Sequence, residues 1–209
     1  MKQLLINIFA AAATTVAGFA DVLTYHNDNS RTGVNPFDTA LTIKNVNPLT
    51  FGKKFDLPVD GQVYAQPLVV SNISIGGVLH SVLVVATEHD SVYGFDAFSG
   101  ALLWRTTILP AGEVPADNIN CTQITPEHGI TSTPVIDRRV HQVFVLGMSR
   151  TLTGAHIERL HAIDLSTGKN LMSAVIAAQF PGTFPAPDVV GGRCNGKPCR
   201  SFSVRRCYY

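Results

Sequence analysis

The residues best suited to chemistry stand in two short clusters of acids and histidines. Glu88-His89-Asp90 is the densest group of ionisable side chains, and Glu127-His128 precedes the stretch GITSTP. An imidazole beside a carboxylate can act as a general base that the acid orients. The alternative is a solvated loop, because neighbouring residues on a strand point to opposite faces. We take Glu88, His89, Glu127 and His128 as candidates for the mouth of a ligand-binding site.

Other patterns of catalytic or metal-binding residues are weak. His156 and His161 are five positions apart and have no third ligand nearby, so we expect no metal site there. The sequence contains no G-x-S-x-G, P-loop or H-E-x-x-H motif. No catalytic residue is assigned from the sequence.

An internal repeat positions both clusters. Its segments are apolar, rich in β-branched or aromatic residues, and bounded by Gly, Asn, Asp or Ser, as is typical of short strands. The predicted segments are Gln62–Val70, Ser81–Ala86, Ser91–Asp96 and Ala101–Ile108 in the first copy, and Ile130–Asp137, Gln142–Leu146, Glu158–Asp164 and Lys169–Ile176 in the second. We expect the longer loop after the first strand in the first copy, and before the third strand in the second copy.

Each copy contains the same turn pattern. Asp96 and Gly100 in GFDAFSGALLW match Asp164 and Gly168 in AIDLSTGKNLM. The aspartate can accept backbone N–H bonds and shape the turn, and the glycine supplies a positive φ. Trp104 then points into the space between neighbouring sheets. We interpret these five residues as structural.

Four short antiparallel strands per copy are typical of a β-propeller blade. We predict an all-β fold with about two blades of an incomplete ring, the first at 61–108 and the second at 129–176, within a propeller region at 61–190. An extension at 21–60 precedes them, and its segment Phe51–Val59 is expected to be a strand that completes another blade. Two blades leave an apolar face uncovered at each end, so we expect self-association.

The repeat resembles a known family. The D-x-x-x-G-x-x-x-W pattern is similar to the repeat of pyrroloquinoline quinone (PQQ) propellers. Residues 26–70 resemble the N-terminal part of quinoprotein alcohol dehydrogenases, and the resemblance covers roughly Tyr25 to Ile176. Such families close the ring with about eight blades, so the resemblance implies that this chain is a fragment.

The resemblance also implies positions for a cofactor, PQQ with calcium. Tyr64 stands three residues before Pro67, where the family has a glutamate that contacts the quinone. Thr131, three residues before Pro134, matches a threonine that touches the quinone. Tyr64 and Thr131 are therefore the candidate cofactor-binding residues.

Other parts of the family's site are missing. The place of the calcium-ligating glutamate falls near Thr153, and no carboxylate follows until Glu158. The family's adjacent cysteine pair is absent because only Cys121 lies in that region, and its catalytic aspartate belongs to later blades. Calcium takes six or more oxygen ligands, with charge among them. The resemblance supports the fold and not the chemistry, so no cofactor is assigned.

The first 20 residues are typical of a signal peptide. One lysine precedes an apolar run from Leu4 to Ala13, and small residues end at Ala20, where we place the cleavage. The run is too short to span a bilayer. No lipidation cysteine stands at the boundary. We expect a secreted protein, extracellular or periplasmic.

The tail at 191–209 differs from the rest in composition. It has five basic residues and no acid, whereas the preceding residues carry 11 basic and 15 acidic side chains. No basic stripe with interleaved aromatics appears in the body, so nucleic acid is an unexpected partner. Cys194, Cys199 and Cys207 stand in the tail; zinc is one alternative for them, and a disulfide is favoured in a secreted chain. Their pairing, with Cys121, stays open. We expect the tail to be unstructured or not homologous to a blade.

Two functions remain. The first is a secreted binding propeller, or a fragment of one, whose ligand is a small molecule, a glycan or a protein and which has no reaction of its own. The second is part of a PQQ-dependent oxidoreductase that acts on alcohols or sugars. A scaffold of envelope assembly built from the same repeat is disfavoured by the missing lipidation site.

Overall fold

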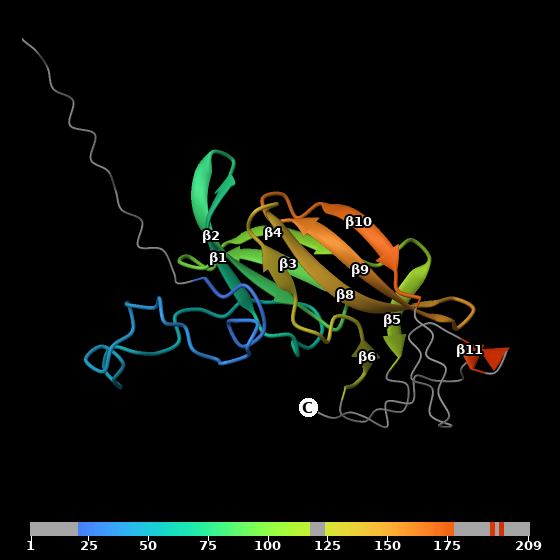
Figure 1. Ribbon diagram of the computed structural model, residues 1–209, viewed down its shortest axis with the longest axis horizontal. Coiled ribbons are helices and arrows are strands. Elements are labelled where there is room, and N and C mark those ends of the chain that lie inside the picture. The colour runs from blue at the N-terminus through green and yellow to red at the C-terminus, as the bar shows by residue number, and fades with distance from the viewer. Residues whose placement is uncertain (1–20, 118–123, 178–192, 195–196, 199–209) are drawn as a thin grey trace, which may run out of the picture.

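The structure, a computed structural model, describes residues 21–117 and 124–177 and two short strands, β11 (Arg193–Cys194) and β12 (Lys197–Pro198), which pair with each other (Figure 1). These residues form strands, turns and loops, which confirms the predicted all-β fold. Within them, no helix has the length and apolarity that crossing a membrane requires. The proposed signal peptide and most of the tail lie outside these ranges.

The first sheet is a four-stranded antiparallel meander. Its strands β1 (Leu68–Ile75), β2 (Val78–Ala86), β3 (Ser91–Asp96) and β4 (Leu102–Thr107) lie in sequence order. This is the strand order predicted for a blade.

The second sheet contains a similar meander. Strands β7 (Val135–Asp137), β8 (Gln142–Thr151), β9 (His156–Asp164) and β10 (Asn170–Val175) pair consecutively and antiparallel. Asp137 pairs with Gln142, and Gln142 pairs with Asp164 at the other edge of β8. The two sheets therefore share one strand topology.

Two further strands extend the second sheet. Strand β5 (Glu113–Asp117) pairs with the far end of β8, from Ser149 to Thr151, along the same edge that β7 occupies. Strand β6 (Glu127–His128) pairs with β5. Strands β5 and β7, from different parts of the chain, thus share one edge of β8.

The two predicted long loops are wrong, because each forms the end of a hairpin. In the first copy, β1 continues to Ile75 and β2 starts at Val78, with Gly76 and Gly77 at positive φ (58° and 83°) between them. In the second copy, β8 and β9 extend to the turn at 152–155. Two glycines flanked by alternating apolar residues are a strong hairpin signal, which the strand prediction missed.

The predicted strand Phe51–Val59 and the first parts of the predicted strands Gln62–Val70 and Ile130–Asp137 are not strands. Residues 51–59, 62–67 and 130–134 form no ladder. Strands β1 and β7 each begin directly after the repeat's proline, Pro67 or Pro134, which has no N–H to donate.

The core lies between the two sheets. Leu68, Val70, Val82 and Val84 of the first sheet pack in one buried cluster with side chains of the second (Ile136, Val143, Val145, Ile163 and Leu165). Trp104 is 7% exposed, and its indole N–H donates to the Leu165 carbonyl at 2.8 Å. The tryptophan joins the sheets by apolar contact and by a hydrogen bond.

The repeated turns have matching geometry. Asp96 Oδ1 accepts the N–H groups of Phe98 and Ser99 at 3.1 and 2.8 Å, and Asp164 Oδ1 accepts those of residues 166 and 167 at 2.9 and 2.8 Å. Gly100 and Gly168 have φ values of 74° and 70°. A Cβ on Gly168 would also lie 2.8 Å from the Trp104 ring, so this turn receives the tryptophan.

Residues 21–23 connect the two sheets. Val22 exchanges two backbone hydrogen bonds with Val69 of β1, and the Leu23 carbonyl accepts the Ile136 N–H of β7 at 2.8 Å. One short segment thus lies hydrogen-bonded between the first strands of both sheets.

The side chain of Asp21 strengthens this connection. Asp21 Oδ1 accepts the N–H and hydroxyl of Ser71, both at 2.8 Å, and Oδ2 pairs with Arg138. Arg138 also donates to the Ser71 carbonyl at 3.2 Å. Three residues far apart in sequence therefore form one polar link between the sheets.

Candidate functional site

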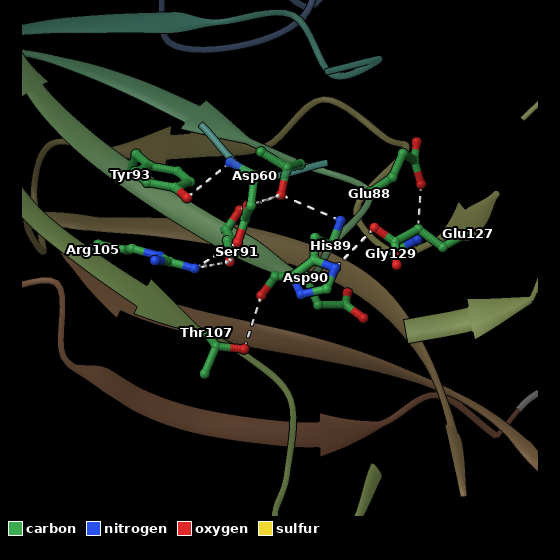
Figure 2. Close-up of polar contacts among 11 residues, drawn as sticks. Asp60, Glu88, His89, Asp90, Ser91, Tyr93, Arg105, Thr107, Glu127 and Gly129 are labelled. Carbon is green, nitrogen blue, oxygen red and sulfur yellow. Dashed lines mark hydrogen bonds and ion pairs between the residues drawn. The ribbon is translucent and has the colours of Figure 1, made fainter. Parts of the chain in front are cut away.

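The tight loop between β2 and β3 carries the predicted cluster Glu88-His89-Asp90 (Figure 2). The Thr87 N–H donates to the Ser91 carbonyl at 3.0 Å, and the Asp90 N–H donates to the Thr87 carbonyl at 3.2 Å. Asp90 has φ 55°, a left-handed conformation that aspartate tolerates better than most residues. The turn fixes the directions of all three side chains.

Backbone from two other segments clamps this loop. The Glu88 N–H donates to the Gln62 carbonyl at 2.9 Å, and the Ile130 N–H donates to the Thr87 carbonyl at 3.2 Å. A Cβ on Gly129 would lie 2.3 Å from the Glu88 carbonyl oxygen, so only glycine allows this approach. The loop is therefore rigidly held at the junction of the two sheets.

Glu88 is buried although it is an acid. It is 1% exposed, and its Oε2 accepts the Gly129 N–H at 2.8 Å and the Thr131 hydroxyl at 3.0 Å. Its Oε1 has no hydrogen-bond partner. Burial raises the pKa of Glu88 above its ordinary value, although the two donated bonds act in the opposite direction.

Asp90 is buried to the same extent, and neither of its carboxyl oxygens has a partner. Burial, together with the negative charges of Glu88, Glu127 and Glu113, raises the pKa of Asp90 to about 8. The carboxyl is therefore mainly protonated at neutral pH, because an isolated buried charge costs far more than a neutral acid.

The second predicted cluster lies beside the first. His89 Nδ1 is 2.9 Å from Glu127 Oε1, and both side chains keep contact with solvent. His128 is buried, its Nε2 has no partner, and burial lowers its pKa. The structure thus brings Glu88, His89 and Glu127 together, with His128 next to them in β6.

Asp60 is a member of the site that sequence reasoning missed. Its carboxylate accepts the hydroxyls of Thr87 and Ser91 at 3.0 and 2.7 Å and the Arg105 guanidinium at 2.6 Å, and its N–H donates to the Tyr93 hydroxyl at 3.1 Å. Partial burial alone would raise the pKa of Asp60, but the donors outweigh it and the pKa is lowered. No sequence pattern marks Asp60, because its partners follow at least 27 residues later.

The solvent-accessible part of the site is a polar rim formed by Asp60, His89, Arg105 and Glu127, each with a partly or largely exposed side chain. Glu88 and Asp90 lie beneath it. Because these two acids are almost fully covered, they cannot reach a bound molecule without movement of the loop. Direct contact with a ligand therefore falls to the rim, whose donors and acceptors are already paired and oriented.

The residues implied for PQQ and calcium binding have different surroundings in the structure. The Thr131 hydroxyl donates to Glu88, and Tyr64 is 39% exposed in the segment before β1. Thr153 lies exposed in the turn between β8 and β9, and its hydroxyl is 2.9 Å from that of Thr151. Uncharged hydroxyls do not supply the carboxylate oxygens that calcium takes, so these residues do not fit the ion.

The two histidines considered above as metal ligands have other partners. His156 Nε2 is 3.1 Å from Asp117 Oδ1, and His161 Nδ1 is 2.9 Å from the Asn170 amide nitrogen. Over residues 21–117 and 124–177, no three His, Cys, Asp or Glu side chains are grouped in a way that could hold a metal ion. Cys121, Cys199 and Cys207 lie outside the described residues, and for Cys194 only the backbone strand is described.

A cavity of about 520 Å³ lies away from the acidic cluster. It is open and shares no residue with the polar rim. Its lining comes from the N-terminal segment and the link between the sheets: Asp21, Leu23, Asn27, Asp28, Pro36, Phe37, Ser71 and Arg138. The charged groups of this cavity, Asp21, Asp28 and Arg138, bond to neighbouring protein groups, as those of the rim do.

The fold and the site together define an all-β protein whose two blade-like sheets enclose buried acids beneath a polar rim. No family model and no curated protein matches the chain. Among solved structures, BamB from Moraxella catarrhalis is similar, with 17% sequence identity and a TM-score of 0.31. That match covers 60% of this chain and 40% of BamB, so the chain spans less than half of the protein it matches.

Proposed function

We propose that this chain is a secreted, non-enzymatic binding scaffold made of propeller blades, and that its ligand contacts the polar rim. The observation that carries this proposal is the rim itself. His89 and Glu127 are paired at 2.9 Å, Arg105 and Asp60 at 2.6 Å, and all four remain accessible over a rigid loop. Secretion rests on residues 1–20 and is tested separately, by locating the chain in culture medium or cell fractions.

The chemistry of the rim favours a ligand rich in hydroxyl groups, such as a glycan. Oriented carboxylates accept hydrogen bonds from hydroxyls, while guanidinium and imidazole N–H groups donate to them. Arg105 places a positive charge among the carboxylates of Asp60 and Glu127 in the same rim, so a strongly charged ligand has no advantage there. Preoriented side chains also lose little conformational entropy on binding.

Saturation-transfer NMR with the full chain and a panel of neutral oligosaccharides tests this proposal. We expect signal transfer to one or more glycans, and we expect it to fall in the double variant His89→Ala/Glu127→Gln. Arg139→Ala is the matched control, because Arg139 is 89% exposed and bonds only to Asp137 among the described residues. Absence of transfer from the whole panel, or transfer equal in the double variant, contradicts the proposal.

A titration with PQQ and calcium distinguishes the binding scaffold from the alternative function, part of a quinone-dependent oxidoreductase. Trp104 is the chain's single tryptophan, and it is buried between the two sheets. We expect no saturable change in its fluorescence at micromolar PQQ with calcium, since Thr153 offers no carboxylate. A saturable, calcium-dependent change would favour the oxidoreductase.

A further inference from the structure

The Asp90 carboxyl occupies a place in the structure that does not suit its charged form. The residue is 1% exposed, and neither carboxyl oxygen has a hydrogen-bond partner. A Cβ added to Gly147 of β8 would lie 2.8 Å from Asp90 Oδ1 and closer still to the Ile108 side chain. The carboxyl therefore packs against the backbone of β8 and an apolar side chain. An ionised carboxylate there would lose its water and gain no donor.

The charged groups around Asp90 do not compensate a negative charge. Three neighbouring carboxylates, from the loop itself, β5 and β6, disfavour its ionised form: Glu88, Glu113 and Glu127. In the described part of the chain, the arginines on the strands around the loop bond to other acids, Arg159 of β9 to Glu113 and Arg105 of β4 to Asp60. The closed loop thus holds an acid that is stable there only with its proton.

Few backbone bonds attach the β2–β3 loop to its surroundings. The two clamping bonds described above, from the Glu88 N–H and to the Thr87 carbonyl, lie outside the strand ladders. A third joins the Ile108 N–H to the Asp90 carbonyl at 2.9 Å, and the Thr107 hydroxyl contacts the same carbonyl at 3.3 Å (Figure 2). The loop can therefore leave its place while the ladders of both sheets stay paired.

We propose that the β2–β3 loop opens locally and that opening becomes more frequent as the pH rises, because the Asp90 carboxyl ionises once the loop has left the interior. The rest of the chain stays folded. Opening also takes His89 away from Glu127, so the polar rim is complete only while the loop is closed. The opening itself requires no ligand; only the consequence that a ligand selects the closed form rests on the proposed function.

Proton release sets the direction and the size of the pH dependence. The closed loop keeps the Asp90 proton up to about pH 8, whereas an open loop releases it near the ordinary value of 3.8. The opening equilibrium constant therefore increases about tenfold per pH unit between about pH 4 and about pH 8, and levels off above that range. Burial also raises the pKa of Glu88, so this second acid acts in the same direction.

Local opening differs from unfolding of the sheets in how it responds to urea. The loop breaks a few backbone bonds when it opens, whereas unfolding exposes the whole core. The effect of urea on an equilibrium scales with the surface that becomes exposed. Amides released by the loop alone should therefore exchange at a lower free energy, with little urea dependence, than amides released by unfolding.

Native-state amide hydrogen exchange of the full chain, followed by NMR from about pH 5 to about pH 8 with and without low urea, tests the proposal. The amides of Glu88, Ile108 and Ile130 report on the loop, and the Ile136 amide and the Trp104 indole N–H report on the sheets. After correction for intrinsic exchange, we expect the loop amides to be at least about tenfold less protected than the two reference groups. Their protection should fall about tenfold per pH unit and depend little on urea.

Asp90→Asn removes the titrating group at a position with φ 55°, which asparagine also tolerates. We expect the loop amides of this variant to lose the tenfold change per pH unit that Asp90 causes, with only the contribution of Glu88 remaining. Asp56→Asn is the matched control, because Asp56 is exposed and pairs only with Lys53 among the described residues. It should keep the pH dependence of the parent chain.

Two results would overturn the proposal. Loop amides with the same protection and urea dependence as the Ile136 amide would show that the loop opens only when the sheets unfold. A pH dependence that Asp90→Asn leaves unchanged would assign the released proton to another group. The first comparison uses the parent chain alone, so it decides the matter even if the variant does not fold. Neither measurement involves a ligand, so both are independent of the glycan experiment.

Discussion

Two acids at the β2–β3 loop show how backbone geometry controls protonation at the scale of single residues. Asp90 sits at positive φ in a turn closed on both sides, so its carboxyl is held in the interior rather than turned toward water. Its neighbours add negative charge instead of donors. The same loop directs His89 outward, where it meets Glu127. One tight turn thus holds the Asp90 carboxyl in the interior and the His89 side chain at the surface.

The raised pKa of Asp90 predicts a defined pH dependence of stability. The unfolded carboxyl ionises near 3.8 and the folded one near 8, so the stability associated with this group is fully present below about pH 4. It is lost progressively as the pH rises from about 4 to about 8, because the unfolded state releases its proton first. Glu88 contributes in the same direction.

Asp90→Asn removes this ionisation. We expect the variant to gain about 6 kcal/mol relative to the parent chain between about pH 4 and about pH 8, in urea unfolding followed by circular dichroism. Asp56→Asn is a suitable control because Asp56 is exposed and pairs only with Lys53 among the described residues. A difference between Asp90→Asn and the parent that does not change with pH would show that the folded carboxyl titrates normally.

Arg159 and Glu113 form the best-buried ion pair in the described part of the chain. The guanidinium donates to both carboxylate oxygens, at 2.7 and 2.8 Å, and the side chains are 13% and 12% exposed. The bonds from Arg159 lower the pKa of Glu113. Arg159→Ala leaves this carboxylate buried without its cation, so we expect a loss of about 3 kcal/mol in urea unfolding. Adding Glu113→Gln should recover part of it, and no recovery would show that lost packing, not charge, causes the effect.

At the scale of strands and turns, the repeat was predictable, and its deviations have local causes. Asp96 and Asp164 stand in the same position because each turn needs one acceptor for two N–H groups. The stretch around Gly76 and Gly77, which we expected to be a loop, forms strand pairs up to Ile75 and Val78, and the two glycines form the turn between them. Segment 51–59 has the alternating apolar residues of a strand, but Leu57 and Val59 instead pack on Val85, Tyr93 and Phe95 of the first sheet without strand pairing.

The candidate site was predictable only in part for a similar reason. Glu88, His89 and Glu127 stand in short runs of ionisable residues, and such runs can be recognised in a single sequence. Asp60 and Arg105 are isolated charges whose meaning depends on a contact across 45 residues. Contacts between distant segments follow from how the sheets pack, and no local pattern encodes that.

Trp104 and Met172 occupy equivalent positions in different surroundings, which predicts unequal effects of truncation. Trp104→Ala should lose about 3–5 kcal/mol in urea unfolding, because a buried ring and its bond to Leu165 are removed. Met172→Ala should lose less than about 1 kcal/mol, because Met172 is 44% exposed. Equal losses would show that the second position is as buried as the first.

At the scale of the whole molecule, residues 21–23 connect the two sheets by hydrogen bonds. Asp21 and Arg138 supply the polar link, and a double-mutant cycle of Asp21→Asn and Arg138→Gln measures it. Arg138 is 42% exposed, so solvent screens the pair, and we expect a coupling of about 1 kcal/mol that shrinks as salt is added. A coupling near zero at low salt would show that the backbone bonds of Val22 and Leu23 hold the sheets without this pair.

The position of Leu23 has a consequence for the order of folding. Its carbonyl bonds to the Ile136 N–H, whose residue lies 113 positions later in the sequence (136 − 23). Such a long sequence separation carries a large loop-closure entropy and slows the rate at which the final contacts form. The first sheet, whose strands are neighbours in sequence, can assemble much earlier. We therefore expect the bonds of Val22 to Val69 to form with the first sheet, and the bond of Leu23 to Ile136 to form later, when β7 is in place.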